Sequence, residues 1–338
     1  MASRRRREQV SPSSVDESVP VVWALAWSEA AGLRTLTGLE AVKKAFADEQ
    51  NRLWIDLKSP DRQTLDHLAK VLSLHPLVTE DILEQNQRSK VEEAGGVLHI
   101  VMFALRYAGE IVNHELDIVL GSRWLLTAHD GDLDLRDAPF RRREPDVHLD
   151  EGVDFTLWVI ADWLVDDYFP VFDRLGDEID QLENDVMRQP TNWIVERLFA
   201  VRRDLLTIRH TVTPQREIFN QLTNRDLRLI KPERVIYFRD VYDHLIRLTD
   251  ELDTYRELVG TAIDIYLSQV NNSLSETVKK LTVATVILAG AGAVAGIFGM
   301  SEVALALSFS EPRFWLVTGA IVAMMVTAYI YFKRNGWF

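Results

Sequence analysis

The sequence of 338 residues contains no cysteine, which excludes disulfide bonds, thiolate zinc sites and thiol catalysis. Its eight histidines show no His-Glu-x-x-His or His-x-His spacing, and it has no phosphate-binding loop or Gly-x-Ser-x-Gly segment. A formal net charge of −13 disfavours the concentrated basic surface that nucleic acids require. These absences argue against an enzyme and against a nucleic-acid-binding protein.

The amino-terminal segment, residues 1–20, has no apolar core of the kind found in signal peptides. Four arginines at 4–7 are followed by serine, proline and acidic residues. We therefore expect a disordered basic arm rather than a secretory signal. Contact of this arm with anionic lipid remains an alternative.

Charge is absent from two long segments near the carboxyl end. Residues 281–300 and 314–332 form uncharged runs of twenty and nineteen residues. The mean hydropathy of the whole chain, −0.06, does not reveal these runs because the rest of the chain is hydrophilic. About 20 helical residues span the roughly 30 Å of hydrocarbon in a bilayer. The sequence thus predicts two transmembrane helices and a multi-pass protein of the cell membrane, in contact with lipid.

Basic residues flank these two spans on their outer sides, and membrane proteins keep Lys and Arg cytoplasmic. The connecting segment, 301–313, carries Glu302 and Glu311 against the single Arg313. We expect both chain ends to be cytoplasmic and only this loop to lie outside. The flanking residues would form a basic ring of Lys279, Lys280, Lys333 and Arg334.

Two helices cannot enclose a hydrophilic path, so any route for a solute requires several copies of the chain. Small residues that allow close helix approach occur in the first span, at Gly290, Gly292, Gly296 and Gly299. The residues alone therefore predict a membrane homo-oligomer.

The segment 21–152 has the mixed pattern of a cytoplasmic α/β domain with a partly antiparallel sheet. We predict strands over 21–27, 53–57, 97–107, 115–120 and 124–129, and helices over 39–48, 61–74 and 76–87. Asp61 is a plausible helix start, and His75 is more plausible as a helix-start residue than as a ligand.

Long helices are predicted from residue 153 to 232, and one longer helix over 233–300. The first covers 155–187, and Gln189-Pro190 interrupts the pattern before a second begins at 191, with a kink expected at Pro214. Proline is then absent from Glu233 to Pro312. The simplest interpretation is one stalk helix of some 65 residues, about 100 Å long, continuous with the first span. Its apolar stripe needs partner helices.

Several segments resemble the CorA family of divalent-cation channels. They are residues 75–92 (HPLVTEDILEQNQRSKVE), 164–169 (LVDDYF), 237–244 (YFRDVYDH), 266–282 (YLSQVNNSLSETVKKLT), 295–300 (AGIFGM) and 331–338 (YFKRNGWF). The resemblance covers nearly all of the chain from about residue 21.

This resemblance implies a funnel-shaped homopentamer whose first spans line a pore, with residues 314–332 facing lipid. It implies passive transport of Mg²⁺, and often Co²⁺ or Ni²⁺, without an organic cofactor. It also implies regulatory Mg²⁺ held between subunits by two carboxylate pairs, Asp81 with Asp240 and Glu80 with Asp162. Low cytosolic Mg²⁺ would loosen the ring and open the pore.

The sequence departs from the family pattern at the predicted pore. The family's Gly-Met-Asn signature is replaced by Gly299-Met300-Ser301, and a Ser hydroxyl reaches less far than an Asn amide. The resemblance places eight residues along the pore, several of them smaller than usual: Asp264, Leu267, Asn271, Ser275, Val278, Leu281, Ala289 and Gly292. Smaller rings would weaken a hydrophobic gate and relax selectivity.

Two other functions stay open. One is a zinc or other transition-metal transporter of the ZntB kind, although the predicted carboxylate ligands favour Mg²⁺ over zinc. The other is a non-conducting membrane sensor or scaffold that keeps the cytoplasmic switch, a possibility raised by Ser301.

Overall fold

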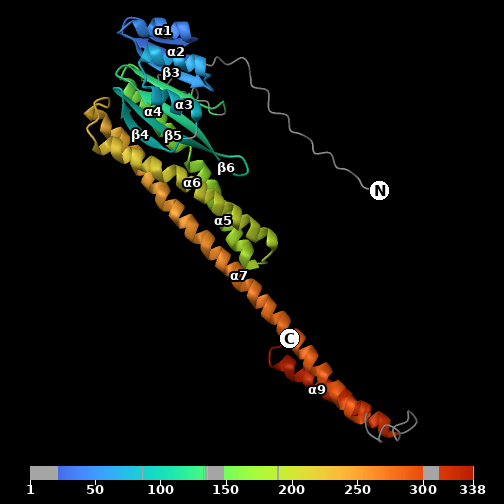
Figure 1. The fold of residues 1–338 in the computed structure, drawn as a ribbon. Helices are drawn as coiled ribbons and strands as arrows, with labels where there is room; N and C mark the ends of the chain where they lie inside the picture. The colour runs from blue at the N-terminus through green and yellow to red at the C-terminus, as the bar shows by residue number, and fades with distance from the viewer. Residues whose placement is uncertain are drawn as a thin grey trace, which may run out of the picture. The chain divides into compact units, whose positions relative to one another are not determined.

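We describe the fold from a computed structural model that covers residues 22–85, 87–131, 133, 135, 148–188, 190–299 and 312–337. The chain divides into two compact units (Figure 1). One comprises the described residues up to Asp180 together with Phe199–Leu258, and the other comprises Gln181–Leu198 and the described residues from Val259 onward. Three long helices, α5, α6 and α7, each contribute residues to both units, and the consecutive segments that we predicted stay a prediction.

The first unit contains a mixed sheet with the strand order β2-β1-β3-β7-β6-β5-β4. Only the β3–β7 pair is parallel, and the other five pairs are antiparallel. The predicted α/β class with a partly antiparallel sheet is confirmed. The strands are β1 Val22–Ser28, β2 Gly32–Thr37, β3 Arg52–Lys58, β4 Lys90–Ala94, β5 Val97–Tyr107, β6 Ile111–Leu120 and β7 Trp124–His129.

Three short helices share a hydrophobic core with the sheet: α1 (Leu39–Ala47), α2 (Arg62–Leu72) and α3 (Pro76–Glu84). Asp61 caps α2 by accepting a hydrogen bond from the Thr64 amide at 2.6 Å. His75 caps α3, where its Nδ1 accepts from the Leu77 amide at 3.2 Å. Both residues start helices as the sequence predicted, since each satisfies an amide that the first turn leaves unpaired.

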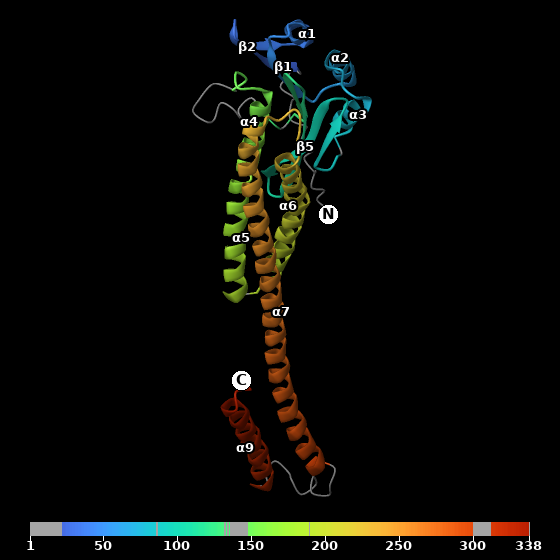
Figure 2. The ribbon, with the colours of Figure 1, turned by 90° about the vertical axis from the view of Figure 1, so that its left-hand side faces the viewer.

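Helix α4 (Val153–Asp166) packs against β3, β5, β6 and β7. It lies on the side of the sheet away from α2 and α3 (Figure 2). Nearly all of its residues are buried, including two carboxylates, Asp154 and Asp162. A buried carboxylate needs compensating partners, and Asp154 has one in the Lys231 amide, which donates to its Oδ2 at 3.2 Å.

The helix that we predicted over 155–187 is in fact two helices, α4 and α5 (Phe169–Arg188), separated by a turn at Asp167 and Tyr168. Tyr168 is fully buried, and its hydroxyl contacts Gln215 Oε1 at 2.9 Å and the Phe103 carbonyl. The break also has a local signal that the prediction of one helix over 155–187 overlooked: Pro170 lies in the first turn of α5, where proline is tolerated, and it disfavours a helix that continues through the preceding residues.

Helix α6 (Asn192–Asn224) continues through Pro214, and a 3₁₀ turn, η2 (Pro232–Arg234), precedes α7 (Val235–Gly299). Helix α7 is 65 residues long and uninterrupted, in agreement with the sequence pattern. Its buried stripe in the first unit consists of Phe238, Val241, Leu245, Leu248 and Leu252. The last helix is α9 (Pro312–Arg334).

Among the described residues, one helix, Pro232–Ile297, contains a segment apolar enough to cross a membrane by length and composition. Strands β2 and β4 were not predicted. Both lie at sheet edges, and most of their residues are exposed or half-buried, so neither shows the apolar alternation on which strand prediction depends.

Candidate divalent-cation site

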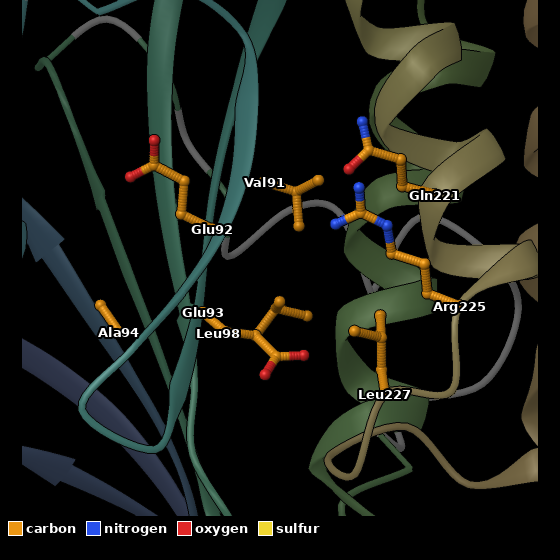
Figure 3. A pocket seen from close by; sticks show the side chains of 8 residues that line it. All are labelled: Val91, Glu92, Glu93, Ala94, Leu98, Gln221, Arg225 and Leu227. Atoms are coloured by element: carbon orange, nitrogen blue, oxygen red, sulfur yellow. The ribbon is translucent and has the colours of Figure 1, made fainter.

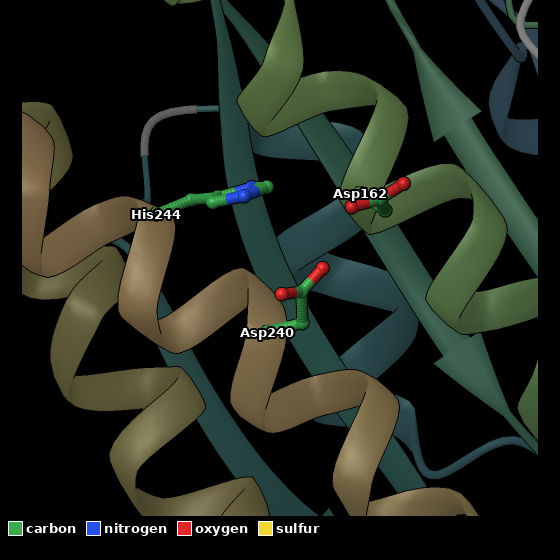
Figure 4. A group of neighbouring side chains, drawn as sticks. All are labelled: Asp162, Asp240 and His244. Carbon is green, nitrogen blue, oxygen red and sulfur yellow. The ribbon is translucent and has the colours of Figure 1, made fainter.

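Three potential metal ligands meet in the first unit: Asp162 on α4, and Asp240 and His244 on α7 (Figure 4). One ligand atom from each lies within 4.8 Å of the others. Asp162 is only 4% exposed, whereas Asp240 is exposed and His244 is half-buried. The group therefore lies at the edge of the buried core, with one side chain inside the domain and one accessible from its surface.

The helix geometry accounts for the pairing of Asp240 with His244. Residues four apart lie on the same face of a helix, one turn above each other. His244 Nδ1 lies 3.5 Å from Asp166 Oδ1, and its ring packs edge-on against Phe169 at a centroid distance of 5.7 Å. The contact is a close approach of charged groups without a hydrogen bond, because Nδ1 is buried and has no hydrogen-bond partner among the described residues.

The donor set of two carboxylates and one imidazole fits a divalent cation. Carboxylate oxygens suit Mg²⁺, which favours octahedral oxygen coordination and keeps several waters. The imidazole adds affinity for Co²⁺, Ni²⁺ or Zn²⁺. Three ligands leave coordination positions for water or for groups from another chain. A dication here would also offset the cost of burying the Asp162 carboxylate.

Sequence reasoning named Asp162 and Asp240 but missed His244. The available signal was the four-residue spacing from Asp240 within the segment YFRDVYDH. The expected partners from α3 do not belong to this group: Glu80 is exposed, and Asp81 pairs with Lys90 at 2.7 Å. The expected pairs Asp81–Asp240 and Glu80–Asp162 involve two subunits, so they stay a prediction.

Behind Asp81 lies a cluster of buried ionisable groups. His99 Nδ1 is 4.0 Å from Asp81 Oδ2, and His99 Nε2 is 2.8 Å from Asp117 Oδ1. Burial raises the pKa of the Asp117 carboxyl, and the hydrogen bond to His99 opposes this shift. Burial, reinforced by the charge of Asp117, also raises the pKa of Glu115 to about 7.

The raised pKa of Glu115 predicts a pH dependence of stability. The unfolded chain loses this proton near pH 4.5 and the folded chain near pH 7, so the free energy of unfolding falls between these values as the pH rises. With a discount for solvent screening, we expect a loss of about 1–2 kcal/mol. Thermal unfolding from pH 5 to 8 should show this loss in the wild type and less of it in Glu115→Gln. Glu110→Gln, an exposed control, should retain the wild-type slope.

The eight residues predicted to line a pore all lie on α7 and are all exposed in the single chain. Their spacing places them within one face of the continuous helix. The buried residues Val259, Ala262 and Tyr266 lie on the opposite face. Gly299 ends α7, whereas Met300 and Ser301 lie outside the described residues, so the predicted pore mouth stays a prediction. The four residues of the expected basic ring are also exposed: Lys279, Lys280, Lys333 and Arg334.

A separate cavity of about 560 Å³ lies between β4 and the end of α6 (Figure 3). Glu93 points its carboxylate toward the helical side, where Arg225 and Gln221 line the cavity, whereas the Glu92 carboxylate points away from them. The guanidinium of Arg225 repels cations, so this cavity is a poorer cation site than the Asp162 group.

The α/β domain thus carries a candidate divalent-cation site, and one of the helices that form it, α7, continues into a long apolar segment. A family model described as "CorA-like Mg2+ transporter protein" matches residues 49–334, and the chain belongs to this family. It is 33% identical over 305 residues to the cobalt/magnesium transport protein CorA of Thermotoga maritima, with 86% of this chain and 85% of that protein covered.

Solved structures show the same fold. The complete CorA magnesium transporter of Methanocaldococcus jannaschii aligns with a TM-score of 0.80 and 24% identity, covering 93% of this chain and 98% of that one. The full-length CmaX protein aligns with a TM-score of 0.71 and 16% identity, covering 94% of this chain and 99% of that one. The family is one of transporters, in agreement with the prediction that the chain is not an enzyme.

Proposed function

We propose that this chain forms a Mg²⁺-regulated channel for divalent cations, in which cytoplasmic ion binding closes the pore. One observation carries the proposal. The candidate ligands Asp240 and His244 belong to the same uninterrupted helix, α7, whose exposed apolar part is predicted to line the pore. A movement of α7 at the candidate ligands is therefore transmitted along the same helix to the segment predicted to line the pore.

The proposed assembly is a homopentamer with two transmembrane spans per subunit and both chain ends in the cytoplasm. The exposed side chains of the carboxyl-terminal part support it. Large apolar residues there are at least half exposed in the single chain, among them Leu267, Leu281, Leu288, Ile297 and Leu316. Water would disfavour such a surface, so lipid and neighbouring subunits should cover it.

The proposed gating is a population shift between closed and open rings. Bound Mg²⁺ stabilises the closed arrangement because its ligands come together only there, and a ligand shifts an equilibrium by its differential affinity. Loss of Mg²⁺ from the cytoplasm removes the charge that holds its carboxylate ligands together, and the open state gains population.

The proposed transported ions are Mg²⁺ and, with relaxed selectivity, Co²⁺ or Ni²⁺. The oxygen ligands favour Mg²⁺. A zinc or other transition-metal transporter of the ZntB kind is the second candidate, and the imidazole of His244 is the observation that favours it.

Ion flux into liposomes that contain the full chain tests these proposals. We expect uptake of Mg²⁺ and Co²⁺ that does not require a pH gradient and that falls when Mg²⁺ is present on the cytoplasmic side. Proton-coupled zinc uptake without Mg²⁺ uptake would instead establish the zinc transporter.

The variant Ser301→Asn tests whether the natural chain conducts ions or has lost transport. Flux in both the wild type and the variant supports the channel. Flux only in Ser301→Asn would identify the natural chain as a non-conducting sensor, because an Asn amide reaches further toward the hydration shell of the ion than a Ser hydroxyl does.

A further inference from the structure

We propose that the Lys90 ammonium competes with the regulatory dication for the Asp81 carboxylate. When the dication binds Asp81, Lys90 forms its ion pair with Glu92 instead. This inference rests on the proposed role of Asp81 as a metal ligand. It adds a residue that sets the ion concentration at which the sensor responds.

The observation is an ion pair at a position predicted to bind metal. Lys90 Nζ lies 2.7 Å from Asp81 Oδ2, and the two side chains are 23% and 21% exposed. Lys90 Nζ also lies 3.5 Å from Glu92 Oε2, whose side chain is 58% exposed. Lys90 therefore stands between two carboxylates, with the shorter contact to the more buried one.

The backbone explains why Lys90 has these two partners. Lys90 is the first residue of β4, and Glu92 follows two residues later on the same face of the strand. Asp81 is presented by α3, close to the start of β4. A lysine ammonium is a compact charge with three rotatable donors on a flexible stem, so it can exchange one carboxylate for another by a small rotation.

Competition follows from the shared oxygen atoms. A dication that coordinates Asp81 needs lone pairs of the carboxylate oxygens, and the Lys90 ammonium occupies one of these oxygens. The dication and the ammonium also repel each other at close range. Transfer of Lys90 to Glu92 removes both obstacles and leaves the lysine paired. Without a bound dication, Asp81 is therefore neutralised by Lys90.

The test is a Mg²⁺ titration of the thermal unfolding temperature of the full chain in detergent micelles, since a ligand that binds the folded state stabilises it by RT ln(1 + [L]/Kd). The fitted Kd is the half-saturating Mg²⁺ concentration. In Lys90→Met we expect the half-saturating Mg²⁺ concentration to fall about fivefold, the upper range for one partly exposed charge pair. In Glu92→Gln it should rise about twofold, because Lys90 then has no second carboxylate.

Two further variants separate direct competition from a general change of charge. Lys90→Arg keeps the charge but allows a bidentate pair with Asp81, so the half-saturating concentration should rise. Lys43→Met removes a lysine with the same 2.7 Å pairing, to Glu40, in the same domain, and should leave the titration unchanged. No shift in Lys90→Met, or an equal shift in Lys43→Met, would overturn the inference.

Asp81→Asn tests whether Asp81 binds the ion at all, separately from the competition by Lys90. If this variant leaves the Mg²⁺ titration unchanged, Asp81 is not a ligand and the proposed sensing role of Asp81 fails together with the inference. If Asp81→Asn weakens the response while Lys90→Met and Lys90→Arg behave like the wild type, the sensor stands and the competition by Lys90 is wrong.

Discussion

Replacement of both Asp162 and Asp240 by asparagine is expected to abolish the saturable response of the protein to Mg²⁺. Each change removes a negative charge from a group whose ligand atoms lie within 4.8 Å of one another. A charge-assisted ligand contact contributes about 1.5–3 kcal/mol, so each single variant should weaken binding roughly tenfold to a hundredfold. The Mg²⁺ dependence of the unfolding temperature and of liposome flux measures both effects.

The flux of the double variant should be high at every cytoplasmic Mg²⁺ concentration, because the closed ring loses its stabilising ligand. Asp243→Asn is the matched control, since Asp243 is an exposed carboxylate on the same helix, one residue before His244, and outside the ligand group. Wild-type inhibition by Mg²⁺ in the double variant would contradict the proposed sensor.

His244→Gln should change the choice of ion more than the response to Mg²⁺. An amide oxygen remains acceptable to Mg²⁺, whereas Co²⁺ loses the imidazole that it prefers. We expect the half-saturating Co²⁺ concentration to rise about tenfold, and the Mg²⁺ value by a smaller factor. Equal changes for the two ions would show that His244 supports the site without binding the metal.

Trp54→Ala is expected to have the largest effect on the stability of the α/β domain. Trp54 is fully buried at the centre of the sheet and packs edge-on against Trp23 at a centroid distance of 5.4 Å. Its Nε1 donates to Thr127 Oγ1 at 3.0 Å, and this hydroxyl donates to Asp56 at 2.6 Å. Truncation leaves a cavity and removes the hydrogen bond that the buried Thr127 hydroxyl accepts, at a cost of about 3–5 kcal/mol.

Thermal unfolding of the full chain measures this loss, which corresponds to a decrease of about 10 °C in a domain of this size. Trp193→Ala is the control, because Trp193 is 61% exposed. Trp54→Phe keeps most of the packing and loses only the N–H donor, so it should cost about 1–2 kcal/mol. A similar loss in Trp54→Ala and Trp193→Ala would show that the core does not depend on Trp54.

The outline of the secondary structure was predictable because it depends on local patterns. The apolar strands β3, β5 and β7, the capped starts of α2 and α3, and the uninterrupted α7 all carry signals in neighbouring residues. The edge strands β2 and β4 carry no such signal, because they have few buried side chains and gain their order from pairing with β1 and β5. The break at Tyr168 does have a local signal, Pro170, and the distant contacts of Tyr168 with Phe103 and Gln215 anchor it.

The sequence by itself determined the family, the α/β class, the long helix and two of the three candidate ligands, because motifs and periodicity are properties of adjacent residues. Only the tertiary structure decided which of these residues meet. It placed Asp162 of α4 beside Asp240 and His244 of α7, and it gave Asp81 a lysine partner from β4. Pairs between separate elements depend on how the sheet and helices pack, and the spacing of residues along the chain does not encode that packing.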